Sequence, residues 1–110
     1  MYKQYLKETQ FIETIEEYYG FITYQIVGTA CIIHDIYILP EFRGNKGLAE
    51  GLADEVVEKA IGCSILGAEV YKGNPAWKAN LRRFKRYGFV VETEDNYEVI
   101  LNKYLGALVC

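Results

Sequence analysis

The segment DIYILPEFRGNKGLAEGLADEV, residues 35–56, constrains the fold more than any other part of the sequence. The isoleucine-rich run over residues 30–39 is typical of a central strand covered on both faces, and Pro40 ends it because proline cannot donate a ladder hydrogen bond. Over residues 47–61, apolar side chains recur at every fourth position, which is the spacing of an amphipathic helix. The segment therefore predicts a strand, a turn that contains Gly44 and Gly47, and a helix.

Strand and helix patterns also run through the rest of the chain. Strands are predicted over residues 11–17, 20–27, 64–71, 89–93 and 97–104, the last two as a hairpin. A short helix is predicted over residues 2–8, and a longer one over residues 76–87, opened by Asn74-Pro75 and ended by Gly88. This order predicts one α/β domain over residues 1–110, with a mixed, mostly antiparallel sheet and two main flanking helices.

The composition is that of a globular protein. Of the 110 residues, 51% are apolar and 25% are charged, and the formal net charge of −3 argues against a surface that binds nucleic acid all over. No segment has the pattern of a signal peptide or the length of a membrane span. Cys31, Cys63 and Cys110 lack metal-ligand spacing, which predicts no metal site and a cytoplasmic protein with reduced thiols.

The turn that precedes the first long helix has the parts of an anion-binding site. The first N–H groups of a helix lack intrahelical partners, and the helix dipole places partial positive charge there. Gly44 and Gly47 would let this backbone approach a phosphate closely, and Arg43 and Lys46 add positive charge. The alternative is a plain tight turn with a solvated arginine. Neither a Walker P-loop nor a dinucleotide fingerprint occurs in the sequence, so the anion would belong to another ligand.

Two motifs in order resemble the GNAT superfamily of acetyl-CoA-dependent N-acetyltransferases. The first is IYILPEFRGNKGLA at residues 36–49, similar to the family's V-x-P-E-x-R-G strand end and its glycine-rich pyrophosphate turn. The second is Asn74 after a strand, then a helix, then Tyr87-Gly88-Phe89. The resemblance covers residues 19 to about 104, and the runs YGFITY and DIYILPEFR look most like short members encoded by bacteriophages.

The resemblance implies acetyl-CoA as co-substrate and assigns residues to it. Backbone groups of Ile38 and Leu39 would hold the pantetheine arm and the thioester, and Asn74 would contact the pantetheine or the acyl group. The pyrophosphate would lie against the turn formed by Arg43, Gly44, Asn45, Lys46, Gly47, Leu48 and Ala49. This turn has one residue more than the family's commonest spacing, which predicts a bulge at Asn45.

The candidate catalytic residues are His34, Asp35 and Tyr87. Many family members place a general-acid tyrosine four residues before the glycine that ends the second helix, but this chain has Phe84 there. Tyr87 is then the tyrosine left near that helix end. His34 or Asp35 could deprotonate the amine through water. Strand alternation predicts His34 on the face of Ile36 and Ile38, and Asp35 on the opposite face. The alternative for His34 is a hydrogen-bonded structural role.

The helix over residues 76–87 is strongly basic. It holds no acidic residue, and Trp77, Leu81 and Phe84 follow the spacing of a face that packs on the sheet. Its cations are Lys78, Arg82, Arg83, Lys85 and Arg86. They form either a solvated face or a contact for an adenosine 3′-phosphate, an acidic protein or nucleic acid.

The sequence and the resemblance together predict transfer of an acetyl group from acetyl-CoA to an amine by direct attack. The acceptor would be a small molecule or a protein amine, with no membrane and no nucleic acid required, and a homodimer is compatible with the apolar C-terminal run. The alternatives are a catalytically inactive acyl-CoA-binding or interaction module, suggested by Phe84, and a nucleic-acid-associated protein that uses the basic helix.

Overall fold

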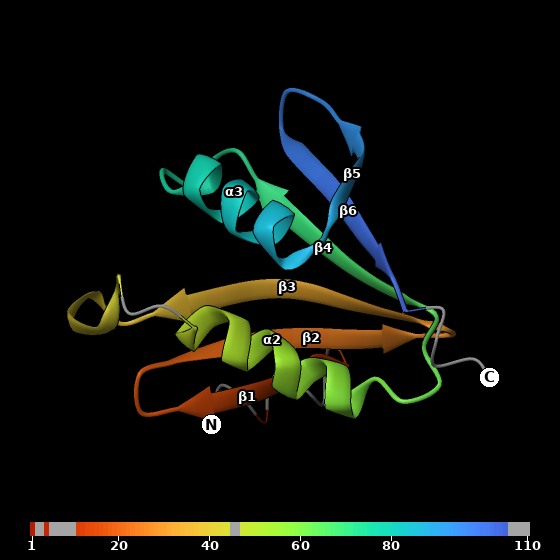
Figure 1. Cartoon of the computed structure of the whole chain (residues 1–110), viewed down its shortest axis with the longest axis horizontal. Coiled ribbons are helices and arrows are strands. Elements are labelled where there is room, and N and C mark those ends of the chain that lie inside the picture. The colour runs from red at the N-terminus through yellow and green to blue at the C-terminus, as the bar shows by residue number, and fades with distance from the viewer. Residues whose placement is uncertain (2–3, 5–10, 45–46, 106–110) are drawn as a thin grey trace.

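The computed structural model describes residues 1, 4, 11–44 and 47–105. Within these ranges, six strands and two α-helices follow one another along the chain (Figure 1). The strands are β1 (Glu13–Glu17), β2 (Gly20–Val27), β3 (Ala30–Ile38), β4 (Ile65–Tyr71), β5 (Val90–Glu94) and β6 (Glu98–Tyr104). The helices are α2 (Leu48–Lys59) and α3 (Trp77–Tyr87), and a 3₁₀ turn, η1 (Pro40–Phe42), follows β3. These elements are confirmed to within two residues at each end. The helix predicted over residues 2–8 lies outside the described residues, apart from Gln4.

The six strands form one sheet in the order β1-β2-β3-β4-β6-β5. Only the central pair β3 and β4 is parallel, and the other four neighbouring pairs are antiparallel. The connection between β3 and β4 runs through α2, as a parallel crossover requires. The predicted mixed, mostly antiparallel sheet is confirmed.

Both α-helices pack on one face of the sheet. In Figure 1, α2 crosses β1, β2 and β3, and α3 lies beside β4. Side chains of both helices meet the apolar face of the sheet in a single core, which removes them from water. Its fully buried members include Ile22, Ile33, Leu52, Val56, Leu66 and Leu101. Among the described residues, no helix is long and apolar enough to cross a membrane.

Gly20 allows β2 to begin close beside the end of β3. It pairs with Ile38, and a Cβ atom at Gly20 would overlap the carbonyl oxygen of Tyr37. Any side chain here would therefore push apart two strands at the end of β3 where the helix α2 follows. The glycine is needed for close backbone approach rather than for an unusual dihedral angle.

A β-bulge at His34 changes which residues of β3 face the helices. Thr23 pairs with Asp35 and Tyr24 pairs with Ile33, so the register leaves His34 as an extra residue. The buried positions accordingly shift from Ile33 before the bulge to Ile38 after it. The strict alternation predicted for this strand is thus wrong at His34.

The two central strands separate after a short stretch of pairing. Residues 30–33 of β3 pair with residues 65–68 of β4, and the register stops there. Beyond Ile33 and Ala68 the two strands diverge, with β3 running toward η1 and β4 running toward α3 (Figure 1). This divergence leaves one edge of the outer half of β3 without a partner strand among the described residues.

Candidate functional site

The backbone of Ile36 and Ile38 faces the space between the diverging strands. The Leu39 N–H donates to the Tyr19 carbonyl at 2.8 Å, which makes that pair a hydrogen-bonded one. In an antiparallel ladder the adjacent pairs alternate, so Ile38 opposite Gly20 and Ile36 opposite Ile22 direct their backbone groups away from β2. Because β4 has already left β3, the backbone groups of Ile36 and the N–H of Ile38 face no described partner strand and can bond a ligand that lies along the strand edge. The Ile38 carbonyl already accepts a bond from Arg43 Nε.

Both backbone groups of Leu39 are engaged within the protein. Besides the bond from its N–H to Tyr19, its carbonyl accepts a bond from Phe42 N at 2.9 Å. The expectation that Leu39 holds the thioester through its backbone is therefore wrong. The reason is that Leu39 belongs to the side of the ladder that faces β2, whereas Ile38 faces the opening.

The turn after η1 leads into the uncapped N-terminus of α2. Gly44 and Gly47 have φ angles of 89° and 94°, a left-handed conformation that favours glycine. A Cβ atom at either position would meet no described protein atom within 4 Å. No described side chain caps α2, and the first intrahelical bond runs from Gly51 N to Gly47 O at 2.7 Å. The N–H groups of residues 48–50 thus precede the helical ladder. Asn45 and Lys46 lie outside the described residues.

Arg43 is tethered to the end of β3. Its Nε donates to the Ile38 carbonyl at 2.9 Å, and its guanidinium lies 5.4 Å from the centre of the Tyr37 ring. These two contacts hold the Arg43 side chain against the strand, so it is not the solvated arginine of the plain-turn alternative. The remaining donors of the guanidinium border the pocket at the start of α2.

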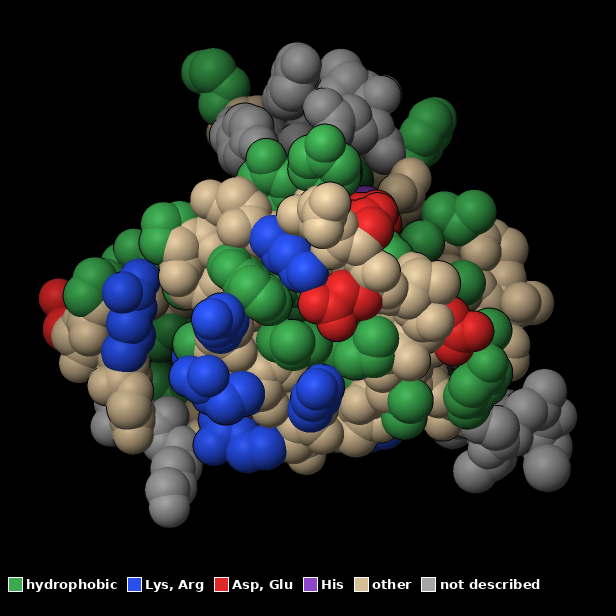
Figure 2. All heavy atoms as spheres, turned by 90° about the horizontal axis from the view of Figure 1, so that it is seen from above, with side chains coloured by type: hydrophobic (Ala, Val, Ile, Leu, Met, Phe, Trp, Pro, Cys, Tyr) green, Lys and Arg blue, Asp and Glu red, His purple; other side chains and the backbone are tan. Residues whose placement is uncertain are grey.

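Two arginines of α3 reach the same pocket as Arg43. The pocket has a volume of about 460 Å³ and lies where the end of β3, the turn and the first turn of α2 meet α3. Arg83 and Arg86 line it together with Arg43, and Glu50 is the acidic residue in the lining. Seen from the α3 side of the molecule, lysine and arginine side chains gather on one part of the surface (Figure 2). The basic helix therefore contributes cations to the turn that the sequence predicted as an anion site.

The sequence named Arg83 and Arg86 only as part of the basic helix as a whole, with a solvated face or a contact for a phosphate, an acidic protein or nucleic acid as the alternatives. The two arginines stand three positions apart, so they lie on one side of α3, and this spacing is the one signal that could have grouped them. Nothing in the sequence indicates which side of α3 faces α2. Four residues that line the pocket were predicted from the sequence motif: Ile38, Arg43, Gly44 and Ala49.

A second pocket, of about 220 Å³, opens between the diverging strands. The residues lining it come from β3, β4, α3, the start of β6 and the loop before α3: His34, Asp35, Ile36, Glu69, Val70, Tyr71, Asn74, Asn80, Phe84 and Glu98. It unites His34, Asp35 and Asn74, which sequence reasoning had selected separately. The acidic residues Glu69 and Glu98 are new members, because their strands are brought beside β3 only by the fold.

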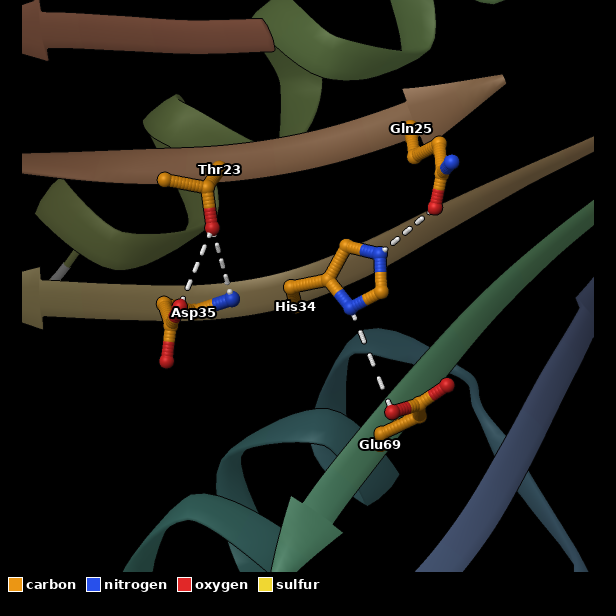
Figure 3. A network of polar contacts seen from close by, with 5 residues as sticks. All are labelled: Thr23, Gln25, His34, Asp35 and Glu69. Carbon is orange, nitrogen blue, oxygen red and sulfur yellow. Dashed lines mark hydrogen bonds and ion pairs between the residues drawn. The ribbon is translucent and has the colours of Figure 1, made fainter. Parts of the chain in front are cut away.

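Side chains of the two neighbouring strands, β2 and β4, position His34 and Asp35. The Thr23 hydroxyl donates to Asp35 Oδ2 at 3.3 Å and accepts from the Asp35 N–H at 3.0 Å. His34 Nε2 lies 3.1 Å from Gln25 Oε1, and Nδ1 lies 3.9 Å from Glu69 Oε2 (Figure 3). His34 and Asp35 thus turn toward the same opening. The bulge is the cause, since it places both on the face that the simple alternation assigned to Asp35 alone.

Asn74 borders the opening through a turn that begins α3. Its Oδ1 accepts a bond from the Ala76 N–H at 2.9 Å, and its carbonyl accepts one from Trp77 N at 2.9 Å. The side-chain carbonyl is therefore used to shape the loop. The Asn74 amide nitrogen is the part of this side chain that could donate to a ligand.

Phe84 and Tyr87 occupy different places on α3. Phe84 is buried, packs edge-to-face against Phe89, and lines the pocket between the strands. The Tyr87 hydroxyl donates to Asp54 Oδ1 at 2.5 Å. Tyr87 does not line the pocket between the strands but a small apolar pocket between α2 and α3, which Phe84 also borders. Burial, followed by the bond to Asp54 and its negative charge, raises the pKa of Tyr87 above its ordinary value.

Solved structures with the same fold come from several microorganisms. An acetyltransferase from Thermus thermophilus aligns with a TM-score of 0.75 at 20% identity, over 93% of this chain and 70% of that one. The PaiA N-acetyltransferase from Thermoplasma acidophilum, in complex with coenzyme A, aligns with a TM-score of 0.71 at 20% identity, over 94% and 67%. The Campylobacter jejuni N-acetyltransferase PseH, in complex with acetyl coenzyme A, aligns with a TM-score of 0.71 at 19% identity, over 94% and 74%.

The sequence itself matches a family model over most of its length. No curated protein sequence matches the chain. The model of the family described as the acetyltransferase (GNAT) family, however, matches residues 4–97. This range includes the strand end, the glycine turn and both helices. The match confirms the resemblance drawn from residues 36–49 and from Asn74 and Tyr87–Phe89, and the chain belongs to the GNAT acetyltransferase family.

Proposed function

We propose that this protein transfers an acetyl group from acetyl-CoA to an amine. The observation that carries the proposal is the free edge of β3 at Ile36 and Ile38, which ends beside an uncapped helix N-terminus. Family membership supports the same activity, as do the coenzyme A and acetyl coenzyme A complexes of the PaiA and PseH proteins.

The phosphates of acetyl-CoA would bind at the start of α2. The N–H groups of residues 48–50, which precede the first intrahelical bond, and the dipole of the helix favour an anion there. Arg43, Arg83 and Arg86 supply positive charge around the same pocket, and their guanidinium groups suit phosphate oxygens. The positive φ angles of Gly44 and Gly47 shape this turn, so both glycines belong to the proposed site.

The thioester would lie along the open edge of β3. The free N–H groups of Ile36 and Ile38 would bond the pantetheine arm in the manner of an added strand. The same edge would donate a hydrogen bond to the acetyl carbonyl oxygen as negative charge develops on it. Ile38 and Ile36 would thus take the role that the sequence predicted for Leu39, because the Leu39 N–H bonds to β2 whereas the N–H groups of Ile36 and Ile38 face the opening.

His34 and Asp35 would accept the proton that the amine must lose. A neutral amine nitrogen attacks the acetyl carbon, the carbon–sulfur bond breaks, and the thiolate of coenzyme A leaves. Both side chains line the pocket at the open edge, and each is held by a neighbour, His34 by Gln25 and Asp35 by Thr23. A proton passed to either one directly, or through one water, completes the transfer. Tyr87 would donate to the thiolate only after its hydroxyl leaves Asp54.

Calorimetric titration of acetyl-CoA into the protein tests the proposed binding site. Gly47→Glu places a carboxylate at the start of α2 and is expected to abolish binding. Gly28→Glu is the matched control, because Gly28 also has a positive φ, 61°, and open space around its Cβ position, but lies in the turn between β2 and β3. Gly28→Glu should bind as the wild type does. Absence of binding by the folded wild type at millimolar acetyl-CoA would refute the proposal.

A second candidate function is favoured by one observation, Phe84 at the position where the family carries its general-acid tyrosine. In this alternative the protein binds acyl-CoA without turning it over. Phe84→Tyr would place a hydroxyl beside the pocket between the strands, since Phe84 lines that pocket. If the wild type is an active enzyme that needs no tyrosine acid, the turnover of Phe84→Tyr should differ from that of the wild type by less than about tenfold. If only Phe84→Tyr is active, the wild type is better described as an acyl-CoA-binding module.

A further inference from the structure

We infer that the acceptor is a small aliphatic amine that carries a second positive charge, such as a short linear diamine. This inference rests on the proposed acetyl transfer and concerns the pocket between the diverging strands. Its basis is the charge of the side chains that line that pocket, together with the opposite charge at the other end of the site.

The pocket between the strands is acidic. Asp35, Glu69 and Glu98 line it from three different strands, and none of the described residues that line it is a lysine or an arginine. The other polar lining residues are His34, Asn74, Asn80 and Tyr71. A ligand that enters this opening therefore meets carboxylates, and a cationic ligand is favoured over a neutral or anionic one.

Among the described residues, no lysine or arginine is paired with Asp35 or Glu69, so their negative charge is not neutralised by such a partner. Asp35 accepts a bond from the neutral hydroxyl of Thr23, and the nearest cationic candidate for Glu69 is His34 at 3.9 Å. Lys72 follows β4 directly, but its amino group lies 2.7 Å from Glu94, on β5. Lys72 therefore pairs with Glu94 and not with the carboxylates of the pocket, whose negative charge remains to attract a cationic ligand.

The spread of the carboxylates suits an extended organic cation rather than a metal ion. Among the described residues, no group of three or more acidic, histidine or cysteine side chains converges closely enough to hold a metal. The carboxylates instead line a pocket of about 220 Å³ together with the exposed aromatic ring of Tyr71. An ammonium group can lie against such a ring while its neighbours are carboxylates.

The two ends of the site have opposite charge, which orients the two substrates. Arg43, Arg83 and Arg86 surround the pocket at the start of α2, where the phosphates are proposed to bind. Asp35, Glu69 and Glu98 surround the pocket at the thioester end. An amine with a carboxylate or a phosphate of its own would be repelled at the second pocket. A diamine can keep one end protonated against the carboxylates while the other end loses its proton and attacks.

The proposed reaction needs only the amine and acetyl-CoA as reactants. The unprotonated amino group forms a bond to the acetyl carbon, the thioester carbon–sulfur bond breaks, and coenzyme A leaves as a thiolate. The proton that the attacking nitrogen releases goes to His34 or Asp35 and from there to solvent or to the thiolate. The second ammonium group keeps its proton throughout, so the product is a monoacetylated cation.

Three acceptors of equal chain length isolate the effect of the second charge. They are 1,4-diaminobutane, 1-aminobutane and 4-aminobutanoate, whose far ends are positive, neutral and negative. Acetylation is followed by separating the acetylated product, at a fixed saturating concentration of acetyl-CoA. The expected order of kcat/KM is diamine, then monoamine, then amino acid, with about fivefold or more between neighbours.

Neutral variants of the lining carboxylates identify the source of the preference. Glu98→Gln and Glu69→Gln should each lower kcat/KM for the diamine by about fivefold and change that for 1-aminobutane much less. Glu92→Gln is the matched control, since Glu92 is an exposed carboxylate on β5 that does not line the pocket. It should leave the discrimination between the two amines unchanged.

Failure of the inference and failure of the proposed function give different results. Turnover of 4-aminobutanoate or 1-aminobutane at a rate equal to that of the diamine would keep the acetyltransferase and overturn the cationic acceptor. If no acceptor turns over, diamine binding is titrated by calorimetry in the presence of coenzyme A. Binding that Glu98→Gln weakens supports the acceptor class even without catalysis, whereas absence of binding overturns it.

Discussion

The hydroxyl of Tyr87 donates a hydrogen bond to Asp54 at 2.5 Å and so fastens the end of α3 to the middle of α2. We expect Tyr87→Phe and Asp54→Ala each to lower the free energy of unfolding by about 1 kcal/mol. The double variant should lose little more than either single one, because the two changes remove the same bond. Urea unfolding of the four proteins measures this.

The same variants test Tyr87 as a general acid. We expect the kcat of Tyr87→Phe to fall no more than a few-fold, as that of Asp54→Ala does, because the hydroxyl is directed at α2. A fall of about a hundredfold in kcat confined to Tyr87→Phe would instead establish the catalytic role predicted from sequence.

Three tyrosines should weaken the fold at alkaline pH. Burial, the largest cause in each case, raises the pKa of Tyr19, Tyr24 and Tyr87 above the ordinary value of about 10. The folded state thus holds these protons more tightly than the unfolded state. Their contribution to stability is complete below about pH 10 and is lost as the pH rises further. Urea midpoints measured from pH 8 to 11 should fall at the upper end. A shallower fall in Tyr24→Phe would confirm the assignment, and an identical fall would contradict it.

Two glycine-to-alanine changes should have opposite effects on stability. Gly20→Ala would force a methyl group against the Tyr37 carbonyl oxygen and is expected to cost about 1–3 kcal/mol. Gly51→Ala, inside α2, has its nearest neighbour at 3.9 Å, the Tyr19 hydroxyl, and should stabilise the helix by about 0.5–1 kcal/mol. Thermal unfolding of both variants checks the signs. Equal stability of Gly20→Ala and the wild type would mean that β2 and β3 do not approach as closely as described.

Arginines of α3 that line the pocket at the start of α2 should differ from Arg82, which does not line it, in their effect on acetyl-CoA binding. Arg83→Gln and Arg86→Gln remove cations from the pocket at the start of α2 and should each weaken binding by about threefold to fivefold, less so at high salt. Arg82→Gln removes an exposed cation of the same helix that does not line this pocket, and it should bind normally. An equal loss in all three variants would point to the overall charge of α3 rather than to contacts in the pocket.

The local parts of the fold could be read from the sequence. Apolar residues at every fourth position predicted α2, and Pro40 marked the end of β3. Gly44, Gly47 and Gly88 have positive φ angles at places where turns or a helix end were predicted. Each of these signals acts over a few neighbouring residues. Local sterics and hydrogen bonding decide them, so the order of neighbours in the chain is sufficient information.

Positions that depend on strand register were not readable in this way. The bulge at His34 arises from how β3 pairs with β2, and the engagement of Leu39 arises from which pairs of that ladder are hydrogen-bonded. Alternation along a single strand cannot reveal an inserted residue, because the extra residue changes the face of everything after it. For this reason the face predicted for His34 was wrong, and the sequence did not reveal that the Leu39 backbone bonds within the protein.

The sequence by itself determined the elements, their order and the motif that marks the family, all of which depend on residues close together in the chain. Tertiary structure alone decided which groups share a site. Arg43 meets Arg83 and Arg86 because α2 and α3 pack side by side, and Asp35 meets Glu69 and Glu98 because β3 and β4 pair briefly and then diverge. Arg43 and Asp35 lie far along the chain from these partners. Only burial of the common core, which holds the helices and strands against one another, brings them together.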